Sequence, residues 1–293
     1  MEAPITYPQW VSENKKSFSP PICNKLMHKG GLSVMFVGGP NSREDFHVDE
    51  SSEFFLQLEG TMSLPIIEKG QRRIVTISEG EVFLLPPRIP HSPQRQGESL
   101  GLVIERRRET EKEFDCLRWY TDSSRCEEVE YENYFACNDL GKDLLNVVHE
   151  YMNYKERRPL GSKFVRSSDK KIIDDVHTVV PPPFNLLSWC AENKDELDKG
   201  VSLSLFGEEH PDTQFEVLVT SERERTIKAE NETFLFQITG SATVSESTNC
   251  EASLDYSLEK NACFVLPSGS SWDLHRDSSL VSLTLILSYM KQI

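Results

Sequence analysis

The chain has 293 residues, enough for two domains of ordinary size, and 38% of them are hydrophobic, as is typical of globular proteins. Its net charge of -15 argues against a nucleic-acid partner, because a phosphate backbone would be repelled. The one basic cluster, Arg106-Arg107-Arg108, is flanked by glutamates. We interpret it as a solvated strand end with locally paired charges and not as a binding patch.

The sequence gives no sign of export or of membrane insertion. The segment Met1–Lys15 lacks a basic stretch followed by an apolar one, and no later apolar run approaches the ~20 residues of a membrane span. The seven cysteines are scattered and form no Cys-x-x-Cys pair, which favours reduced thiols over disulfides or a cysteine metal site. We therefore expect a cytosolic protein that does not enter a membrane.

The first half of the chain has the pattern of an antiparallel β protein. Apolar or alternating runs of strand length recur, separated by turn signals such as Gly38-Gly39-Pro40-Asn41 and Glu79-Gly80. Many short strands with this punctuation favour a barrel or a sandwich. The predicted strands are 32–37, 54–58, 62–67, 73–77, 82–85 and 100–105.

The pattern changes after residue 138. Residues 139–158 place apolar side chains at helical spacing, which predicts an amphipathic helix. A polar, charged stretch follows and ends in three prolines, which is typical of a linker. A second set of strands is then predicted at 201–206, 215–220, 234–239, 263–266 and 280–287. We therefore predict a domain over residues 1–160, a linker over 161–177 and a second domain over 178–293.

The second set of strands repeats the first. Phe54–Gly60 (FFLQLEG) aligns with Phe234–Gly240 (FLFQITG), and Phe83–Pro86 (FLLP) aligns with Phe264–Pro267 (FVLP). The fold class that follows is all-β dominated, with two antiparallel barrels in one chain and a few helices.

Three polar residues in the first half form a candidate metal site, namely His47, Glu53 and His91. Two histidines and one carboxylate are the set that holds non-haem Fe(II) on one face and leaves positions open for substrate and dioxygen. In the second half, Ile227, Thr233 and Trp272 align with them, in that order. None of these three side chains can rebuild the site, and Glu232, one residue out of register, would face the opposite side of its strand. We expect the second barrel to bind no metal.

Three charged residues lie near the candidate ligands in sequence. Arg43 precedes His47 by four positions and Arg95 follows His91 by four, so each pair would share one face of an extended strand. A guanidinium suits a planar carboxylate, so the two arginines indicate an acidic substrate. Glu105 closes the predicted strand at 100–105 and would also face the site.

These residues fall into two motifs that resemble those of the cupin superfamily. The first is His47-x5-Glu53-x6-Gly60, and the second runs from Gly80 through Pro86 and His91 to Arg95. A typical cupin has a further histidine where Asp45 stands and an asparagine where Arg95 stands. The resemblance implies jelly-roll barrels, a bicupin architecture and three metal ligands instead of four.

A further set of motifs consists of Pro20–His28, Val37–Asn41, Phe55–Gly60, Leu84–Arg95 and Glu105–Arg108. By these motifs the chain resembles one family more narrowly, the 3-hydroxyanthranilate 3,4-dioxygenases, in their animal two-barrel form. The resemblance is dense over residues 9–160 and continues through the second barrel. Bacterial members carry an additional cysteine-ligated iron near their end, and this chain lacks those cysteines.

The resemblance implies a reaction. Fe(II) held by His47, Glu53 and His91 would open the ring of 3-hydroxyanthranilate with O2, with Glu53 and Arg43 as catalytic residues and Arg43 beside the dioxygen. Arg95 would bind the substrate carboxylate, with Glu105 and Glu53 also contacting the substrate. The product would be 2-amino-3-carboxymuconate semialdehyde, the precursor of quinolinate in the kynurenine pathway from tryptophan to NAD.

Two alternatives remain open from the sequence. One is a different dioxygenase reaction, on another aromatic compound or a thiol, using the same metal ligands. The other is a non-catalytic bicupin that binds a small carboxylate ligand or a partner protein. Because the second barrel could cover the first within one chain, we expect a monomer.

Overall fold

The computed structural model describes residues 3–18, 23–109, 112–137, 140–157, 171–247, 254–277 and 282–290. The chain divides into two compact units. The first-barrel unit consists of Phe18–Asn24 and Val37–Pro183, and the second-barrel unit of Met1–Ser17, Lys25–Phe36 and Phe184–Ile293. The domain boundaries at residues 160 and 178 stay a prediction, and positions 161–170 of the expected linker lie outside the described residues.

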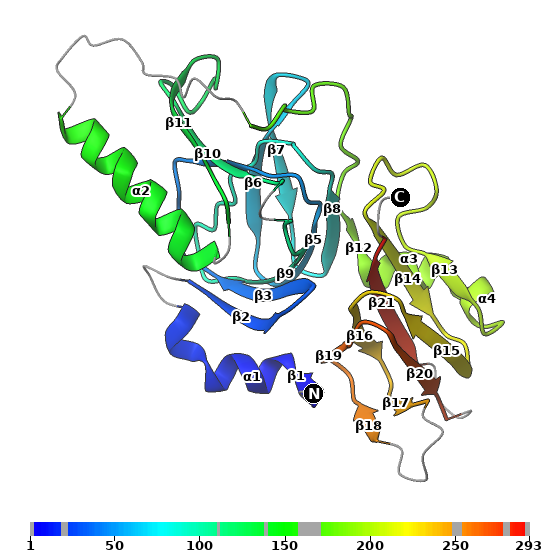
Figure 1. The fold of residues 1–293 in the computed structure, drawn as a ribbon. Coiled ribbons are helices and arrows are strands. Elements are labelled where there is room, and N and C mark those ends of the chain that lie inside the picture. The colour runs from blue at the N-terminus through cyan, green and yellow to red at the C-terminus, as the bar shows by residue number, and fades with distance from the viewer. Residues whose placement is uncertain are drawn as a thin grey trace. The chain divides into compact units, whose positions relative to one another are not determined.

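The first-barrel unit is built from short antiparallel strands and one long helix (Figure 1). Within it, β8, β5 and β9 are hydrogen-bonded in that order, β10 lies between β11 and β4, and β6 pairs with β7. Its elements are β4 (Phe46–Val48), β5 (Glu53–Glu59), β6 (Met62–Glu68), β7 (Gln71–Ile77), β8 (Glu81–Leu85), β9 (Leu100–Arg106), β10 (Asp115–Tyr120), β11 (Val129–Phe135) and α2 (Leu140–Arg157).

The second-barrel unit is likewise built mainly from short antiparallel strands. One sheet has the order β1-β19-β16-β21-β14-β13 and another has the order β15-β20-β17-β18. Its elements are β1 (Ile5–Thr6), α1 (Tyr7–Glu13), the 3₁₀ turn Lys15–Phe18, most of β2 (Asn24–Lys29) and β3 (Leu32–Gly38), β12 (Phe184–Asn185), α3 (Leu186–Glu192), α4 (Lys194–Leu197), β13 (Ser202–Ser204), β14 (Phe215–Thr220), β15 (Glu224–Ala229), β16 (Thr233–Thr239), β17 (Ala242–Glu246), β18 (Asp255–Leu258), β19 (Ala262–Leu266), β20 (Ser270–His275) and β21 (Leu283–Tyr289).

The duplication expected from sequence is visible in the hydrogen-bond register. The order β8-β5-β9 of the first barrel recurs as β19-β16-β21 in the second. The central strand of each set has an irregularity at the same place, between Gln57 and Glu59 in β5 and between Gln237 and Thr239 in β16. The all-β, two-barrel fold class is therefore confirmed, and the predicted strands match β3, β5 to β9, β13, β14, β16, β19 and β21.

The amphipathic helix expected at 139–158 is present as α2. Its apolar face packs on the sheet of β10 and β11, where the ring of Tyr151 stacks on Trp119 with centroids 4.2 Å apart. Val147 is buried in the same cluster, while Met152 on the other face is exposed. Burial of this one apolar face stabilises the helix more than its intrinsic propensity does.

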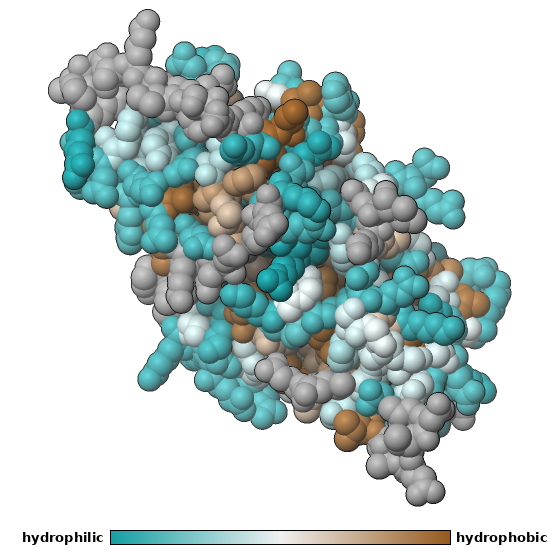
Figure 2. All heavy atoms as spheres, viewed as in Figure 1, coloured by the Kyte–Doolittle hydropathy of each residue, from teal (hydrophilic) through white to brown (hydrophobic). Residues whose placement is uncertain are grey.

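Polar residues dominate the visible surface of the molecule. Figure 2 shows hydrophilic side chains over most of the drawn face, with hydrophobic residues in scattered groups. Exposed large hydrophobic residues such as Ile74, Leu145 and Leu187 belong to different elements, as is normal for a globular protein. Among the described residues, no helix is both long and apolar enough to cross a membrane.

Candidate metal centre

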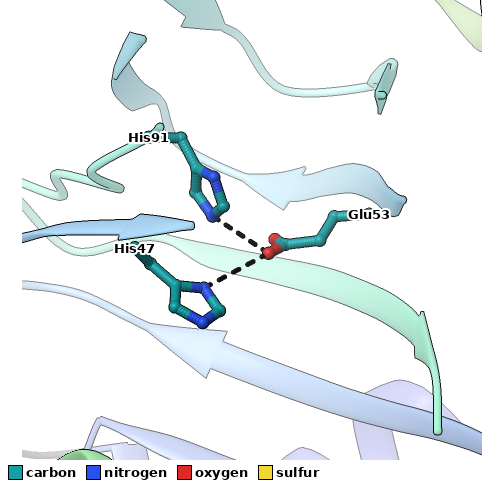
Figure 3. Close-up of side chains that lie close together, drawn as sticks. All are labelled: His47, Glu53 and His91. Carbon is teal, nitrogen blue, oxygen red and sulfur yellow. Dashed lines mark ion pairs between the residues drawn. The ribbon is translucent and has the colours of Figure 1, made fainter. Parts of the chain in front are cut away.

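Three side chains from separate elements of the first barrel converge on one point (Figure 3). His47 lies in the middle of β4, Glu53 begins β5, and His91 follows the turn after β8. The Nε2 atom of His91 is 2.9 Å from Oε1 of Glu53, and the Nδ1 atom of His47 is 3.7 Å from the same oxygen. All three residues are buried. The structure thus brings together the three candidate ligands that the sequence indicated.

Backbone pairing holds the two histidines in place. The N–H of His47 donates to the carbonyl of His91 at 2.8 Å, and the N–H of His91 donates back to His47 at 2.9 Å. Between β4 and β5 the chain turns inside the protein, where the backbone N–H of Ser51 donates to Oδ1 of Asp49. This turn returns the chain so that the first side chain of β5, Glu53, faces the histidines.

The remaining ring nitrogens have partners that fix the orientation of the imidazoles. His91 shares a hydrogen bond between Nδ1 and the carbonyl of Ile89 at 2.9 Å, and His47 shares one between Nε2 and Oδ2 of Asp115 at 2.8 Å. With the proton on those atoms, His91 presents the lone pair of Nε2 and His47 that of Nδ1 toward Glu53. Such outer partners typically orient histidine ligands of metals.

Attraction between the carboxylate and the imidazoles raises the pKa of both histidines and lowers that of Glu53. Burial opposes protonation of His47, but hydrogen bonds with Asp115 and Glu53 outweigh it and raise its pKa to about 10. Burial also opposes protonation of His91, and the charge of Glu53 raises its pKa. Burial would raise the pKa of Glu53, yet the histidines, His91 foremost, lower it well below its ordinary value. The centre therefore attracts positive charge, and a cation would compete with protons for the same atoms.

The donor set fits a metal ion. One ligand atom each from His47, Glu53 and His91 lies within 4.8 Å of the others. Two imidazole nitrogens and one carboxylate oxygen suit a divalent transition metal, and three protein ligands leave coordination positions for other molecules. Two overlapping groups that include Asp49 also meet this distance criterion, namely His47, Asp49 and Asp115, and Asp49, Glu53 and Glu105. Arg108 donates to Asp49, Asp115 and Glu105, so these carboxylates are already paired.

The two arginines expected at the site differ in their surroundings. Arg43 is partly buried and its guanidinium is paired with Asp45, and its charge also acts on Glu53. Arg95 is 2% exposed, and among the described residues its Nε and Nη2 atoms have no hydrogen-bond partner. Burial, followed by repulsion from Arg43, lowers the pKa of Arg95 to about 10, so it remains a cation at neutral pH.

Arg43 and Arg95 do not share a regular strand with His47 and His91, which their spacing had led us to expect. Strand β4 begins only at Phe46, so Arg43 lies outside it. His91 and Arg95 lie in isolated bridges and not in a continuous strand, with Arg95 paired to Asn41. The bridges hold these segments where a regular strand had been expected.

Glu105 lies at the site, and a buried ionic network holds it there. It pairs with Glu53 across β5 and β9, and its carboxylate accepts a hydrogen bond from Nη1 of Arg108. Arg108 also donates from Nη2 to Asp49 at 2.5 Å and from Nε to Asp115 at 3.0 Å. Burial outweighs the attraction of Arg108 and raises the pKa of Glu105 to about 7.

The interpretation of Arg106-Arg107-Arg108 as a solvated strand end was wrong for two of its three residues. Arg106 and Arg108 are buried, and only Arg107 is exposed. Arg106 donates to the carboxylate of Glu113 at 2.7 and 2.5 Å. Because the three residues are identical, the sequence held no signal that could separate the two buried arginines from the exposed one.

Asp115 was not identified from the sequence. It is the first residue of β10, is completely buried, and contacts both His47 and Arg108. Burial raises the pKa of its carboxyl, but Arg108 and the hydrogen bond with His47 lower it below the ordinary value. Strand β10 is buried on both faces, so it lacks the alternation of a half-buried strand and was not among the predicted strands.

In the second barrel, Ile227 and Trp272 pair across β15 and β20, as His47 and His91 pair in the first. Thr233 begins β16, as Glu53 begins β5. Glu232 lies just before that strand, and its carboxylate contacts His28 at 2.9 Å and accepts from the N–H of Leu32 at 2.8 Å. The alignment of the two halves is thus confirmed at these positions, and Glu232 has a structural partner.

Fold and site together define a bicupin protein, with two antiparallel β-barrels and two histidines and a glutamate gathered in one of them. A solved structure of a mutant oxalate decarboxylase from Bacillus subtilis has a similar fold. Its TM-score is 0.52 at 13% identity, over 92% of this chain and 73% of that one. At this identity the likeness concerns the fold alone.

The chain belongs to the 3-hydroxyanthranilic acid dioxygenase family, whose profile matches residues 1–152. It is 38% identical to 3-hydroxyanthranilate 3,4-dioxygenase of Rattus norvegicus, over 97% of this chain and 96% of the relative. The enzyme of the same name from Homo sapiens is 36% identical, again over 97% and 96%. That of Xenopus laevis is 40% identical over 83% of this chain and 85% of the relative.

Proposed function

We propose that this protein is a ring-opening dioxygenase that cleaves 3-hydroxyanthranilate with O2 between C3 and C4. The product is 2-amino-3-carboxymuconate semialdehyde, which closes to quinolinate on the route from tryptophan to NAD. Family membership supports the reaction. The observation that carries the substrate assignment is the buried guanidinium of Arg95, whose Nε and Nη2 have no hydrogen-bond partner among the residues that the structure describes, because an uncompensated buried charge calls for an anionic ligand.

We propose Fe(II) as the metal, held by His47, Glu53 and His91. A ferrous ion bound there supplies the redox chemistry with dioxygen that amino-acid side chains cannot perform. The protein's part is to hold the ligands in place. Asp115 and the carbonyl of Ile89 orient the two imidazoles, and burial keeps bulk water away from the charged cluster.

The second part of the proposal concerns the substrate. Arg95 binds the carboxylate of 3-hydroxyanthranilate through its free nitrogens, in the paired geometry that guanidinium and carboxylate groups favour. Glu105 hydrogen-bonds to the substrate in the same region. Its pKa of about 7 lets the carboxyl act as a donor or an acceptor near neutral pH. Arg43 stabilises negative charge that develops on the dioxygen side, as preorganised donors do in transition states.

Anaerobic reconstitution tests the reaction directly. The purified chain is loaded with Fe(II) and then given O2 and 3-hydroxyanthranilate, and the consumption of both is followed. Equal consumption is expected, with none for the variant H91A, which should also fail to retain iron. Absence of stoichiometric iron uptake by the wild type would favour a non-catalytic bicupin instead.

A substitution separates substrate binding from the metal. Arg95→Ala should raise KM strongly while iron content stays that of the wild type, because Arg95 is not a ligand. Arg107→Ala, at an exposed arginine, is the matched control and should change neither quantity. Unchanged kinetic constants in R95A would contradict the carboxylate assignment. A substrate panel completes the test, since aromatic compounds without a carboxylate should be refused.

Two properties of the whole protein complete the proposal. We propose that it is a monomer, because each chain contains two barrels, and that it acts in the cytosol, where its free thiols remain reduced. Light scattering that showed a stable two-chain species would contradict the monomer.

A further inference from the structure

The two barrels share atomic detail around one buried glutamine. In the first barrel, Nε2 of Gln57 donates to the carbonyl of Glu59 at 2.9 Å. In the second, Nε2 of Gln237 donates to the carbonyl of Thr239 at 2.8 Å. Both glutamines are buried at the irregularity of their strand. Gln57 and Gln237 are therefore equivalent residues.

The residues opposite these glutamines differ. Gln57 pairs with Gly101 across β5 and β9, whereas Gln237 pairs with Thr284 across β16 and β21. Gly101 and Thr284 thus occupy the same place in the two barrels. The internal alignment that sets His91 against Trp272 likewise sets Arg95 against Arg276, four residues further on.

In the second barrel the threonine immobilises the arginine. Nη2 of Arg276 donates to Oγ1 of Thr284 at 2.6 Å, and that hydroxyl donates to Oε1 of Gln237 at 2.7 Å. Arg276 also donates to the carbonyl oxygens of Thr220 and Glu222. Both terminal nitrogens of this guanidinium are thus bonded to groups of its own barrel, and its Nε has no partner among the described residues.

In the first barrel, residue 101 has no side chain to lie between the equivalent arginine and glutamine, because it is a glycine. A Cβ atom added to Gly101 would lie 2.9 Å from Nη2 of Arg95 and 3.0 Å from Oε1 of Gln57. It would therefore stand between an arginine and a glutamine, as Thr284 does in the second barrel. Gly101 does not have a positive φ, so its backbone conformation does not require glycine. Glycine inside a strand weakens it and often marks a close approach of another group.

We propose that Gly101 is a specificity-determining residue, which keeps the guanidinium of Arg95 unpaired so that a substrate carboxylate can bind it. This inference rests on the proposed function for the role of Arg95. A hydroxyl at position 101 would take the hydrogen bonds that the carboxylate needs, as Thr284 does with Arg276. The cost of the unpaired state is a buried cation whose Nε and Nη2 have no partner among the described residues.

The test compares Gly101→Thr with Gly101→Ala, the variant that adds volume without a hydroxyl. Binding of 3-hydroxyanthranilate to the iron-loaded protein is measured by anaerobic calorimetry, with benzoate as a second probe of carboxylate binding. G101T should weaken binding by about tenfold or more, the effect of losing a hydrogen bond to a charged group. G101A should weaken it less. Because the added Cβ atom displaces Nη2 of Arg95 in both variants, the thermal unfolding midpoint of G101T should exceed that of G101A, where no hydroxyl gives Arg95 a partner.

A double variant separates the proposed effect from general damage. In the R95A background, G101T should cause no further loss of binding, because the residue that its hydroxyl captures is absent. Wild-type affinity in G101T, an undiminished loss in R95A/G101T, or an unfolding midpoint of G101T no higher than that of G101A would each overturn the inference. If the wild type binds 3-hydroxyanthranilate or benzoate but consumes no O2, the proposed function fails, and the comparison of affinities still decides the role of Gly101.

Discussion

Replacing Arg108 with lysine tests how far one guanidinium holds the metal centre together. Arg108 is buried and donates to three carboxylates, those of Asp49, Glu105 and Asp115. Lysine keeps the positive charge but has a single nitrogen, so it cannot reach three acceptors arranged around a planar fork. At least two charge-assisted hydrogen bonds would be lost, each worth about 1.5–3 kcal/mol.

The variant R108K should therefore be less stable by about 3 kcal/mol or more. For a unit of this size, that corresponds to a fall of about 6–12 °C in the unfolding midpoint. Scanning calorimetry of the metal-free chain measures it, and R107K is the matched control, because Arg107 is the exposed neighbour in the same segment. A midpoint for R108K within a degree or so of R107K would refute the reasoning, and the three carboxylates would then not depend on the fork.

Two further predictions concern stability outside the metal centre. Burial raises the pKa of Glu232, but the hydrogen bonds with His28 and with the N–H of Leu32 lower it below its ordinary 4.5. The ionised Glu232 therefore contributes fully to stability above pH 4.5, and this contribution is lost as the pH falls through the lower pKa of the folded state. Glu232→Gln should therefore lose less stability than the wild type on acidification in thermal melts, and parallel pH profiles would contradict this. Tyr151→Ala should lower the free energy of unfolding in urea by about 3 kcal/mol, because it removes a buried stacked ring. Met152→Ala, at an exposed position of the same helix, should lower it little. Equal losses in the two variants would contradict the packing of α2.

The strands that the sequence predicted are those with a simple pattern. Strands β5 to β9 have apolar or alternating runs between glycine-containing turns, and α2 has a clear helical period. Strands β15, β17 and β18 are short and rich in polar residues, so they lacked a signal. Strand β10 was missed for the opposite reason, because all six of its residues are buried and Arg118 within it is paired with Glu132 and Asp174.

The residues of the candidate site also differ in whether the sequence alone could identify them. His47, Glu53 and His91 could be found because they occur together with Gly60, Gly80 and Pro86 at the spacing of the cupin motifs. Asp115 and Arg108 could not be placed, since a carboxylate or guanidinium in sequence does not reveal whether it is solvated or buried. Their burial follows from pairing between distant segments, as in the contact of Asp115 with His47.

The indole of Trp272 has a consequence for how the two halves of the chain diverged. It is fully buried in the core of the second barrel, at the position of His91 in the first, and its ring packs edge-on against Phe264. Trp272→His would leave a void in this core, and losing such a large ring costs about 3–5 kcal/mol. Placing a metal ligand at this position would therefore destabilise the second barrel, because the indole that fills its core would be lost.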